Sequence, residues 1–278
     1  MAQQVRRLVV LFLIAALLLV ACSSFSAQPL PPTAPSLVVL NISGSGTITT
    51  VLGALKPAFE TANPGYHLEI LSGSSTGNGV TGILDGILDA AAMARPPKDE
   101  EKAKNIKFFE MGMVGQAIIS HSSLAGITSL EDQQIADIFS GKITNWSEVG
   151  GPNQKIVLYV RDEDDSSTKS LRKNLLGDTP FSESATTLFS QQDMAFSVEG
   201  TPGAIGFAAW VSILATKTNV NAISINGISP SNPSYPIVDS AGVGYMAERE
   251  SDILPLINWL SSQEGQAALK ALGFISTQ

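Results

Sequence analysis

Hydrophobic positions beyond residue 36 follow two alternating periods, one typical of strands and one typical of helices. Residues 37–42 form a short apolar run that predicts a buried strand, and apolar positions at helical spacing over residues 51–59 predict an amphipathic helix. Residues 66–71 alternate like a second strand, and residues 80–88 predict a second helix. Two strand–turn–helix units in succession indicate an α/β fold with a parallel sheet.

The same alternation continues through the rest of the chain, without an internal repeat. It predicts strands at residues 113–120 and 155–160, and helices at residues 130–139, 169–176, 253–261 and 263–272. Periodicity alone therefore predicts the α/β class but does not distinguish a single unit from two lobes.

The first residues of the chain have the pattern of an export signal. Residues 1–7 include two arginines, residues 8–21 are apolar, and Cys22 follows. The apolar run is shorter than the about 20 residues that a membrane-spanning helix needs, so residues 1–21 are interpreted as a secretory signal peptide. Residues 19–22, Leu-Val-Ala-Cys, resemble the bacterial lipobox, which implies cleavage before Cys22 and a lipid anchor on the extracytoplasmic side of the cell membrane. The alternative is an ordinary signal peptide followed by a chance cysteine.

Composition adds three constraints. Cys22 is the only cysteine, so the chain can form no intramolecular disulfide and no cysteine metal cluster. Residues 26–36 are rich in proline and lack periodicity, so we predict that residues 22–36 comprise the lipidated cysteine and a flexible tether. The net charge of -8 argues against nucleic acid as a partner. It does not exclude an anionic ligand, because nearby dipoles and donors govern a buried site.

Three loops with small and hydroxyl side chains stand where a predicted strand passes into a helix: residues 43–47, 72–77 and 166–168. Glycine lets the backbone approach a ligand closely, and the N–H groups at a helix start attract anions. Each loop alone is also explained by helix capping. The three loops together predict a binding site for an oxyanion.

Arg161 and Arg95 are the candidate cations for this site. Arg161 follows a predicted strand and begins the third loop, where its guanidinium could form a bidentate contact with an oxyanion. The alternative is a salt bridge to one of the acids at residues 162–165. Arg95 precedes two prolines and faces either a cleft or solvent.

The sequence shows no constellation of catalytic or metal-binding residues. His67 and His121 are not spaced as metal ligands, and neither a P-loop nor a G-x-S-x-G motif occurs. The acids at residues 162–165 lack the pattern of a calcium loop and are interpreted as solvated. We therefore predict no metal, no cofactor and no enzymatic activity, and a secreted phosphatase-like enzyme is disfavoured.

Taken in order, the loops resemble the phosphate-binding proteins of bacterial phosphate ABC transporters, over essentially the whole chain beyond the tether. The most specific match is residues 138–146, Ile-Phe-Ser-Gly-Lys-Ile-Thr-Asn-Trp, a segment whose implied role is architectural. Further segments that resemble the family, in the same order, are residues 44–47, 73–75, 89–95 followed by 98–101, 203–207, 235–237 and 262–266.

The resemblance implies an α/β periplasmic-binding-protein fold, type II-like, with two lobes, a two-segment hinge and a ligand cleft between the lobes. Residues 37–114 plus 237–278 would form lobe 1, and residues 115–236 would form lobe 2. Closure around the ligand would be a hinge motion that a membrane permease can sense. The resemblance implies that the ligand-binding residues are Ser45, Gly46, Thr47, Ile48, Ser74, Arg161, Ser166, Ser167 and Thr168. The second loop and the candidate cations add Ser75 and Arg95 to the predicted ligand-binding residues.

Two departures from the family pattern bear on the ligand. The third loop reads Asp-Ser-Ser-Thr at residues 165–168, where the family typically has Gly-Ser-Gly-Thr. A carboxylate that in some members accepts a proton from phosphate, and so rejects sulfate, aligns with Ala94. One of the acids at residues 162–165 could turn inward as a substitute.

From these features we expect a monomeric, extracytoplasmic lipoprotein that captures inorganic phosphate and delivers it to the permease of an ABC importer. Two alternatives stay open. The ligand could be another oxyanion, namely sulfate, molybdate, tungstate or a phosphorylated small molecule. The chain could also be a lipid-anchored sensor that passes its ligand state to a signalling partner.

Overall fold

The computed structural model describes residues 37–276. The predicted signal peptide at residues 1–21, the lipid on Cys22 and the tether at residues 22–36 lie outside these described residues and stay predictions. Within residues 37–276, no helix combines the length and the apolar character that crossing a membrane requires.

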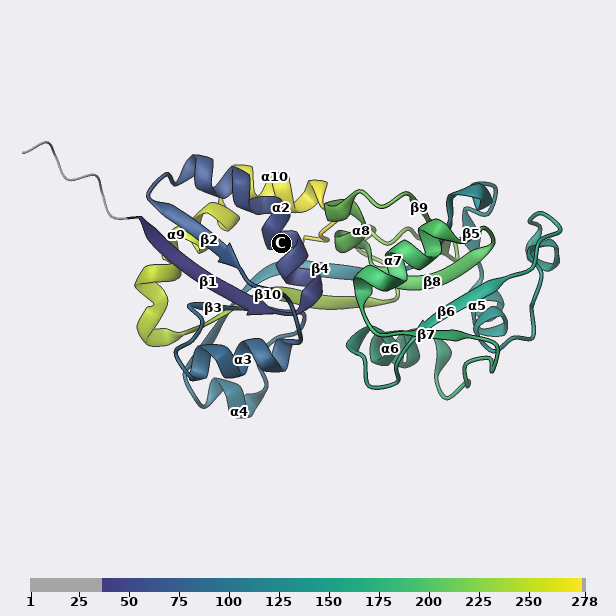
Figure 1. The fold of residues 1–278 in the computed structure, drawn as a ribbon, viewed down its shortest axis with the longest axis horizontal. Coiled ribbons are helices and arrows are strands. Elements are labelled where there is room, and N and C mark those ends of the chain that lie inside the picture. The colour runs from purple at the N-terminus through teal and green to yellow at the C-terminus, as the bar shows by residue number, and fades with distance from the viewer. Residues whose placement is uncertain (1–36, 277–278) are drawn as a thin grey trace, which may run out of the picture. The chain divides into compact units, whose positions relative to one another are not determined.

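The first part of the sheet is parallel, as predicted. β1 (Val38–Gly44) lies between β2 (Tyr66–Ile70) and β3 (Ala90–Met93), and both neighbours run parallel to it. α2 (Gly46–Ala62) and α3 (Thr76–Leu84) connect these strands, as Figure 1 shows. Connections of this kind bring the C-terminal ends of the strands, and the starts of the helices that follow them, to one edge of the sheet.

The second predicted helix ends earlier than its periodicity indicates. α3 ends at Leu84, and the prediction that it continues to Leu88 is wrong. Gly86 follows the helix with a positive φ of 68°, which turns the chain. The Leu88 side chain then packs against Gly82 from outside the helix. The apolar run at residues 80–88 therefore contains a helix end and a turn, both facing one core.

Two long antiparallel strands cross the middle of the sheet. β4 (Ile106–His121) pairs with β10 (Val238–Met246), and its C-terminal part pairs with β8 (Ala204–Ala209) and β9 (Val220–Ile225). With β6 (Val157–Arg161) and β7 (Thr186–Leu188) at one end, the strand order is β2-β1-β3-β10-β4-β8-β6-β7. β4 thus belongs to both halves of the sheet, and Figure 1 shows β4 and β10 running between the two groups of elements.

The remaining elements complete the two halves. In the second half these are β5 (Ser129–Leu130), α5 (Asp132–Phe139), β6 (Val157–Arg161), α6 (Ser166–Leu171), a π-helical turn (Arg172–Leu176), β7 (Thr186–Leu188), α7 (Gln191–Gly200) and α8 (Trp210–Thr216). α9 (Glu250–Ser261) and α10 (Gln263–Ala271) return to the first half. Shorter helical segments are α4 (Asp99–Lys102) and 3-10 turns at Ser122–Leu124, Trp146–Val149 and Ala247–Arg249.

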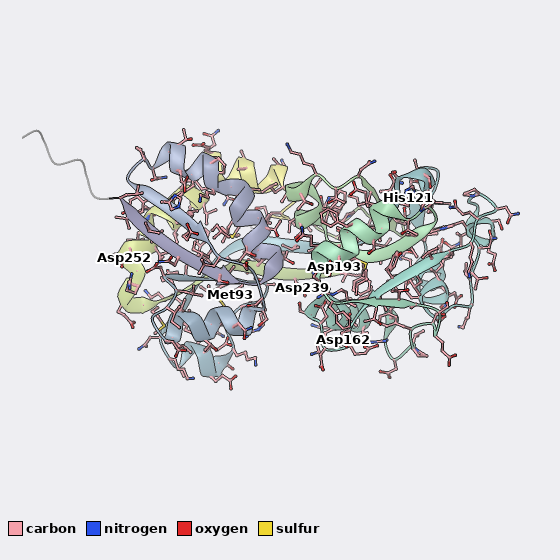
Figure 2. The ribbon with its side chains drawn as sticks, in the orientation of Figure 1. Met93, His121, Asp162, Asp193, Asp239 and Asp252 are labelled. Carbon is pink, nitrogen blue, oxygen red and sulfur yellow. The ribbon has the colours of Figure 1, made fainter. Side chains whose placement is uncertain are left out.

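Separate hydrophobic cores lie in the two halves. One core contains Phe59 and Trp259, whose rings meet edge to face at 5.9 Å. Another contains Phe139, Trp146 and Phe207. We name the half with β1 to β3 lobe 1 and the half with β6 to β8 lobe 2. Figure 2 labels Met93 in lobe 1 and His121 in lobe 2.

Candidate functional site

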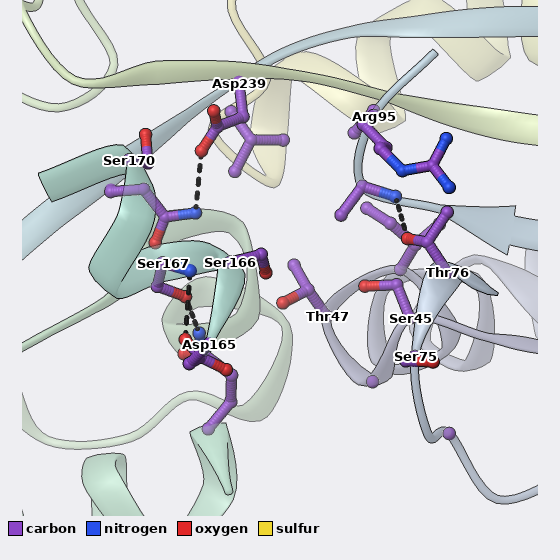
Figure 3. Close-up of a pocket in the computed structure, with 18 of the residues that line it drawn as sticks. Ser45, Thr47, Ser75, Thr76, Arg95, Asp165, Ser166, Ser167, Ser170 and Asp239 are labelled. Atoms are coloured by element: carbon purple, nitrogen blue, oxygen red, sulfur yellow. Dashed lines mark hydrogen bonds between the residues drawn. The ribbon is translucent and has the colours of Figure 1, made fainter. Parts of the chain in front are cut away.

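A cavity of about 860 Å³ lies between the lobes, and all three predicted loops line it. Figure 3 shows their side chains around it. Thr168 is not part of the lining: it is fully buried, because its place in the first turn of α6 directs the side chain into lobe 2. The predicted residues that do line the cavity are Ser45, Gly46, Thr47, Ile48, Ser74, Ser75, Arg95, Arg161, Ser166 and Ser167.

The first loop presents the start of α2 to the cavity. Ser45 is the N-cap residue of α2, but its side chain makes no capping hydrogen bond. The first-turn N–H groups of Gly46, Thr47 and Ile48 have no carbonyl partner within the helix, as at every helix start. The dipole of this 17-residue helix adds partial positive charge at the same place. For this loop, capping is therefore the weaker explanation.

The second loop packs directly against the first. The Ser74 N–H donates to the Gly44 carbonyl at 2.6 Å, and Ser45 and Ser74 form an isolated parallel bridge. Ser75 accepts a hydrogen bond from the Asn78 N–H at 3.2 Å and so caps α3. Helix capping, the alternative to anion binding, therefore explains Ser75. It does not explain Ser74, which caps no helix.

Gly73 allows the close contact between the two loops. A Cβ atom at this position would lie 2.6 Å from Gly46 Cα and 2.5 Å from Thr49 Oγ1, so the loops would have to separate. We expect Gly73→Ala to lower the free energy of unfolding by about 1–3 kcal/mol, as overpacking does, when measured by urea denaturation. Gly77→Ala is the matched control, because a Cβ there meets only the Ser75 hydroxyl, at 3.8 Å. Equal stabilities of the two variants would contradict this role of Gly73.

Arg161 forms the salt bridge that was the alternative to anion binding, and it also lines the cavity. Its Nη2 atom donates to Asp165 Oδ2, while Asp165 Oδ1 accepts the Ser167 N–H at 2.9 Å and caps α6. Arg161 is only 8% exposed, and its Nε and Nη1 atoms are buried without a hydrogen-bond partner among the described residues. Buried charged donors without an acceptor are costly. Asp165 therefore holds the guanidinium in place and leaves two of its donor atoms unsatisfied by the described part of the chain.

Arg95 lines the cavity, but its guanidinium is already paired. Nη1 and Nη2 donate to the two carboxylate oxygens of Glu101 at 2.8 Å each, and Nη1 also donates to the Pro96 carbonyl. The hydrogen bond from Arg95 lowers the pKa of Glu101 below its usual range. The sequence left open whether Arg95 faces a cleft or solvent. The structure places it in the cavity lining, with its charge balanced by Glu101.

Several polar residues of the cavity wall were not identified from the sequence. Gln116 comes from β4 and Asp239 from β10. Gln191, at the start of α7, donates from Nε2 to Ser167 Oγ at 2.5 Å and so supports the third loop. These residues have no local sequence signal, because the crossing of distant strands and helices brings them to the cavity.

The two histidines lie outside the cavity lining. His67 Nδ1 is 3.0 Å from Glu60 Oε1, and His121 Nδ1 is 2.7 Å from Ser123 Oγ. Within residues 37–276, no group of three or more His, Cys, Asp or Glu side chains is arranged to hold a metal ion. Both histidines thus have local partners, in agreement with a structural role.

Comparison with known proteins shows relatives over most of the chain. A protein-family model described as a PBP superfamily domain matches residues 30–264. The phosphate-binding protein PstS of Bacillus subtilis is 29% identical over 205 residues, which cover 71% of this chain and 67% of that protein. The phosphate-binding protein PstS of Borreliella burgdorferi is 23% identical over 252 residues, covering 85% of this chain and 89% of that protein.

Solved structures share the fold. A Clostridium perfringens protein solved with bound phosphate aligns with a TM-score of 0.71 at 26% identity, covering 86% of this chain and 100% of that chain. An ABC-type phosphate transport receptor from Vibrio cholerae aligns with a TM-score of 0.60 at 21% identity, covering 85% and 99%. The predicted two-lobed, type II α/β fold is confirmed by these alignments. With the family model matching residues 30–264, the chain belongs to the PBP superfamily, the superfamily of periplasmic binding proteins.

Proposed function

We propose that this chain is the extracytoplasmic binding protein of an ABC importer and that its ligand is inorganic phosphate. The observation that carries the proposal is Arg161, a buried cation with two donor atoms that have no partner within residues 37–276. It lies at a cavity that the start of α2 and several hydroxyl groups also line. An oxyanion suits this set, because all of these groups can donate hydrogen bonds. The names of the relatives, and the phosphate bound to the Clostridium perfringens protein, support phosphate as that oxyanion.

Each lobe would contribute a different kind of donor. In lobe 1, the Thr47 hydroxyl and the N–H groups at the start of α2 would bind the anion, with Ser74 beside them. In lobe 2, Arg161 would add charged hydrogen bonds, and Ser166 and Ser167 would add neutral ones. Charged hydrogen bonds are stronger than neutral ones, so Arg161 would supply the largest single share of the affinity.

Ligand capture would require the lobes to close. The cavity of about 860 Å³ far exceeds one phosphate ion, so donors from both lobes can reach the same ion only after the lobes approach. Figure 3 shows Thr47 and Ser166 reaching into the cavity from opposite sides. A permease that binds the closed form better than the open form would then respond to the ligand.

The two segments of the hinge would be β4 and β10, which run between the lobes. We accordingly propose residues 37–114 plus 237–278 as lobe 1 and residues 115–236 as lobe 2. Val211 of α8, assigned to lobe 2 by this division, packs in the core of lobe 1. Ile213 of the same helix packs with Ala117 and Met194 in lobe 2, so we expect α8 to act as a pivot between the lobes when they close.

Attachment to the outer face of the cell membrane, through a lipid on Cys22, is the remaining part of the proposal. The Leu-Val-Ala-Cys sequence at residues 19–22 supports it. Mass spectrometry of the protein extracted from membranes tests this anchor, because an unmodified Cys22, or a chain cut elsewhere, would contradict it.

Isothermal titration of the full-length protein, purified in detergent and stripped of bound ligand, tests the proposed ligand. We expect tight binding of phosphate at a single site and far weaker binding of sulfate. Binding of sulfate, molybdate or tungstate without phosphate would assign the cavity to another oxyanion. Absence of binding to any of these ions would contradict the proposed function.

A further inference from the structure

Asp239 is a carboxylate in the cavity wall that the proposed phosphate contacts do not use. It lies on β10 opposite Val114 of β4, where the two strands pass between the lobes, and Figure 2 shows it there. Its side chain is half-buried. In Figure 3 it lies on the same wall as Ser170. Like Asp164 and Asp165 in the same lining, it is an acid among groups that can donate hydrogen bonds to an anion.

The Asp239 carboxylate has capacity to accept further hydrogen bonds. Gln116 Nε2 donates to Oδ2 at 3.3 Å and the Ser170 hydroxyl acts as a second hydrogen-bond donor, whereas an ionised carboxylate can accept about four hydrogen bonds. Asp239 takes part in none of the ion pairs found within residues 37–276. Burial raises its pKa above the usual range of an aspartate, and hydrogen bonding and the charge of Lys173 act against this shift.

The four acids at residues 162–165, which the sequence suggested as a source of an inward carboxylate, are engaged elsewhere. Asp162 accepts the Asp164 N–H, Glu163 pairs with Arg172, and neither of these two acids lines the cavity. Both Asp165 oxygens accept hydrogen bonds, from Arg161 and from the Ser167 N–H. The Asp164 side chain is 97% exposed and pairs with Lys169. The carboxylate on β10 is therefore the better placed acceptor in the cavity wall.

A carboxylate can distinguish two tetrahedral oxyanions of nearly equal size by their protons. Hydrogen phosphate keeps an O–H group at neutral pH and can donate it to the carboxylate. Sulfate has no proton to donate, so it meets repulsion and leaves the acceptor unsatisfied. Backbone N–H groups, hydroxyls and an arginine donate to both ions alike, so they provide affinity without this discrimination.

We propose that Asp239 is the residue that selects protonated oxyanions, by accepting their hydroxyl hydrogen when the lobes close. The inference rests on the proposed function and deepens it. Arg161 and the start of α2 would supply most of the affinity, and the carboxylate on the hinge strand would supply the selectivity.

Titration of the full-length protein with phosphate and with sulfate at neutral pH tests this role. Asp239→Asn keeps the size of the side chain but replaces one acceptor oxygen by an NH2 donor. We expect the variant to bind phosphate roughly 10- to 100-fold more weakly and to gain sulfate binding, so that the ratio of the two affinities collapses. Asp164→Asn is the matched control, because it removes the same charge from an exposed side chain of the same cavity. It should leave the ratio unchanged.

The possible outcomes separate the selectivity role from other roles. A variant that loses affinity for both ions equally would show a role of Asp239 in the fold or the hinge and would overturn the inference, as would an unchanged ratio. If the wild-type protein does not bind phosphate, the proposed function fails, and the inference fails with it. If the wild-type protein binds both ions equally well, the selectivity inference alone fails.

A second measurement gives its main result on the wild-type protein. As the pH falls from neutral, Asp239 gains a proton earlier than an ordinary aspartate, because its pKa is raised, and its O–H can then donate to sulfate. We expect sulfate binding by the wild-type protein to strengthen as the pH falls, and this dependence to disappear in Asp239→Asn. Sulfate affinity that is independent of pH in the wild-type protein would overturn the inference. The other charged residues that line the cavity are Arg95, Arg161, Asp164, Asp165, Lys169 and Lys173.

Discussion

Replacing Arg161 by alanine is expected to weaken phosphate binding roughly 10- to 150-fold, or about 1.5–3 kcal/mol, the usual scale of a hydrogen bond to a charged group. The guanidinium is 8% exposed, and its Nε and Nη1 atoms have no partner among the described residues, so an anion in the cavity would gain both donors. The substitution would also leave the Asp165 carboxylate without its cation, close to the anion. Isothermal titration of the ligand-free protein with phosphate measures the loss.

Two further variants define what Arg161 contributes. Arg161→Lys keeps the charge but not the planar fork of donors, so an intermediate loss of affinity is expected. Arg249→Ala is the control, because it removes a positive charge from a half-exposed side chain of lobe 1 that does not line the cavity. At moderate salt the control should change the affinity by no more than about twofold. Phosphate affinity that is unchanged in Arg161→Ala would remove this residue from the site.

The largest effect on stability is expected from Trp146→Ala, which should lower the free energy of unfolding by about 3–5 kcal/mol. Trp146 is completely buried in the core of lobe 2, and its Nε1 donates to the Gly203 carbonyl at 2.9 Å. Truncation would leave a cavity and an unsatisfied buried carbonyl. Urea denaturation followed by circular dichroism measures the loss, which is a large part of the about 5–15 kcal/mol that stabilises an ordinary domain.

An exposed aromatic residue provides the control for this effect. Phe189 is 80% exposed, so Phe189→Ala should change the free energy of unfolding by no more than about 0.5 kcal/mol. Trp146→Phe would keep much of the apolar volume and lose the N–H group, which separates packing from hydrogen bonding. A cost of less than about 1 kcal/mol for Trp146→Ala would be too small for a core residue. Such a small cost would contradict the architectural role expected for residues 138–146.

Helices and strands near the site were predictable because each of them buries one side. The apolar runs at residues 37–42, 51–59 and 66–71 correspond to β1, α2 and β2, except for Leu37 and Leu71 at their ends. The first strand was predicted to be buried, but this is wrong for its start, where Val38 is 39% and Val39 is 43% exposed. Prediction failed where a helix and the turn after it face the same core, as at residues 80–88. The start of β4 at Ile106 was also missed, because the sequence indicated a strand only from residue 113 onward.

The loops of the cavity were recognisable from composition, but their roles were not. Serine at a helix start serves either capping or binding, and the sequence is the same in both cases. The Ser75 side chain caps α3 by accepting the Asn78 N–H, whereas the Ser45 side chain makes no capping hydrogen bond. Only the folded structure shows this difference. Arg161 was expected to bind either an acid or an anion, yet its several donor atoms allow it to pair with Asp165 and still line the cavity.

By itself, the sequence determined the α/β class, the three loops and the resemblance to a family of binding proteins, because each of these depends on residues that are neighbours in the chain. Only the tertiary structure decided which polar groups share one cavity. Gln116 and Asp239 are 123 positions apart, and they meet because β4 and β10 pair between the lobes. A contact of this kind leaves no local pattern, since it depends on the path of the whole chain. The sequence therefore predicted an anion site, whereas it held no signal for the carboxylate that we propose to select the anion.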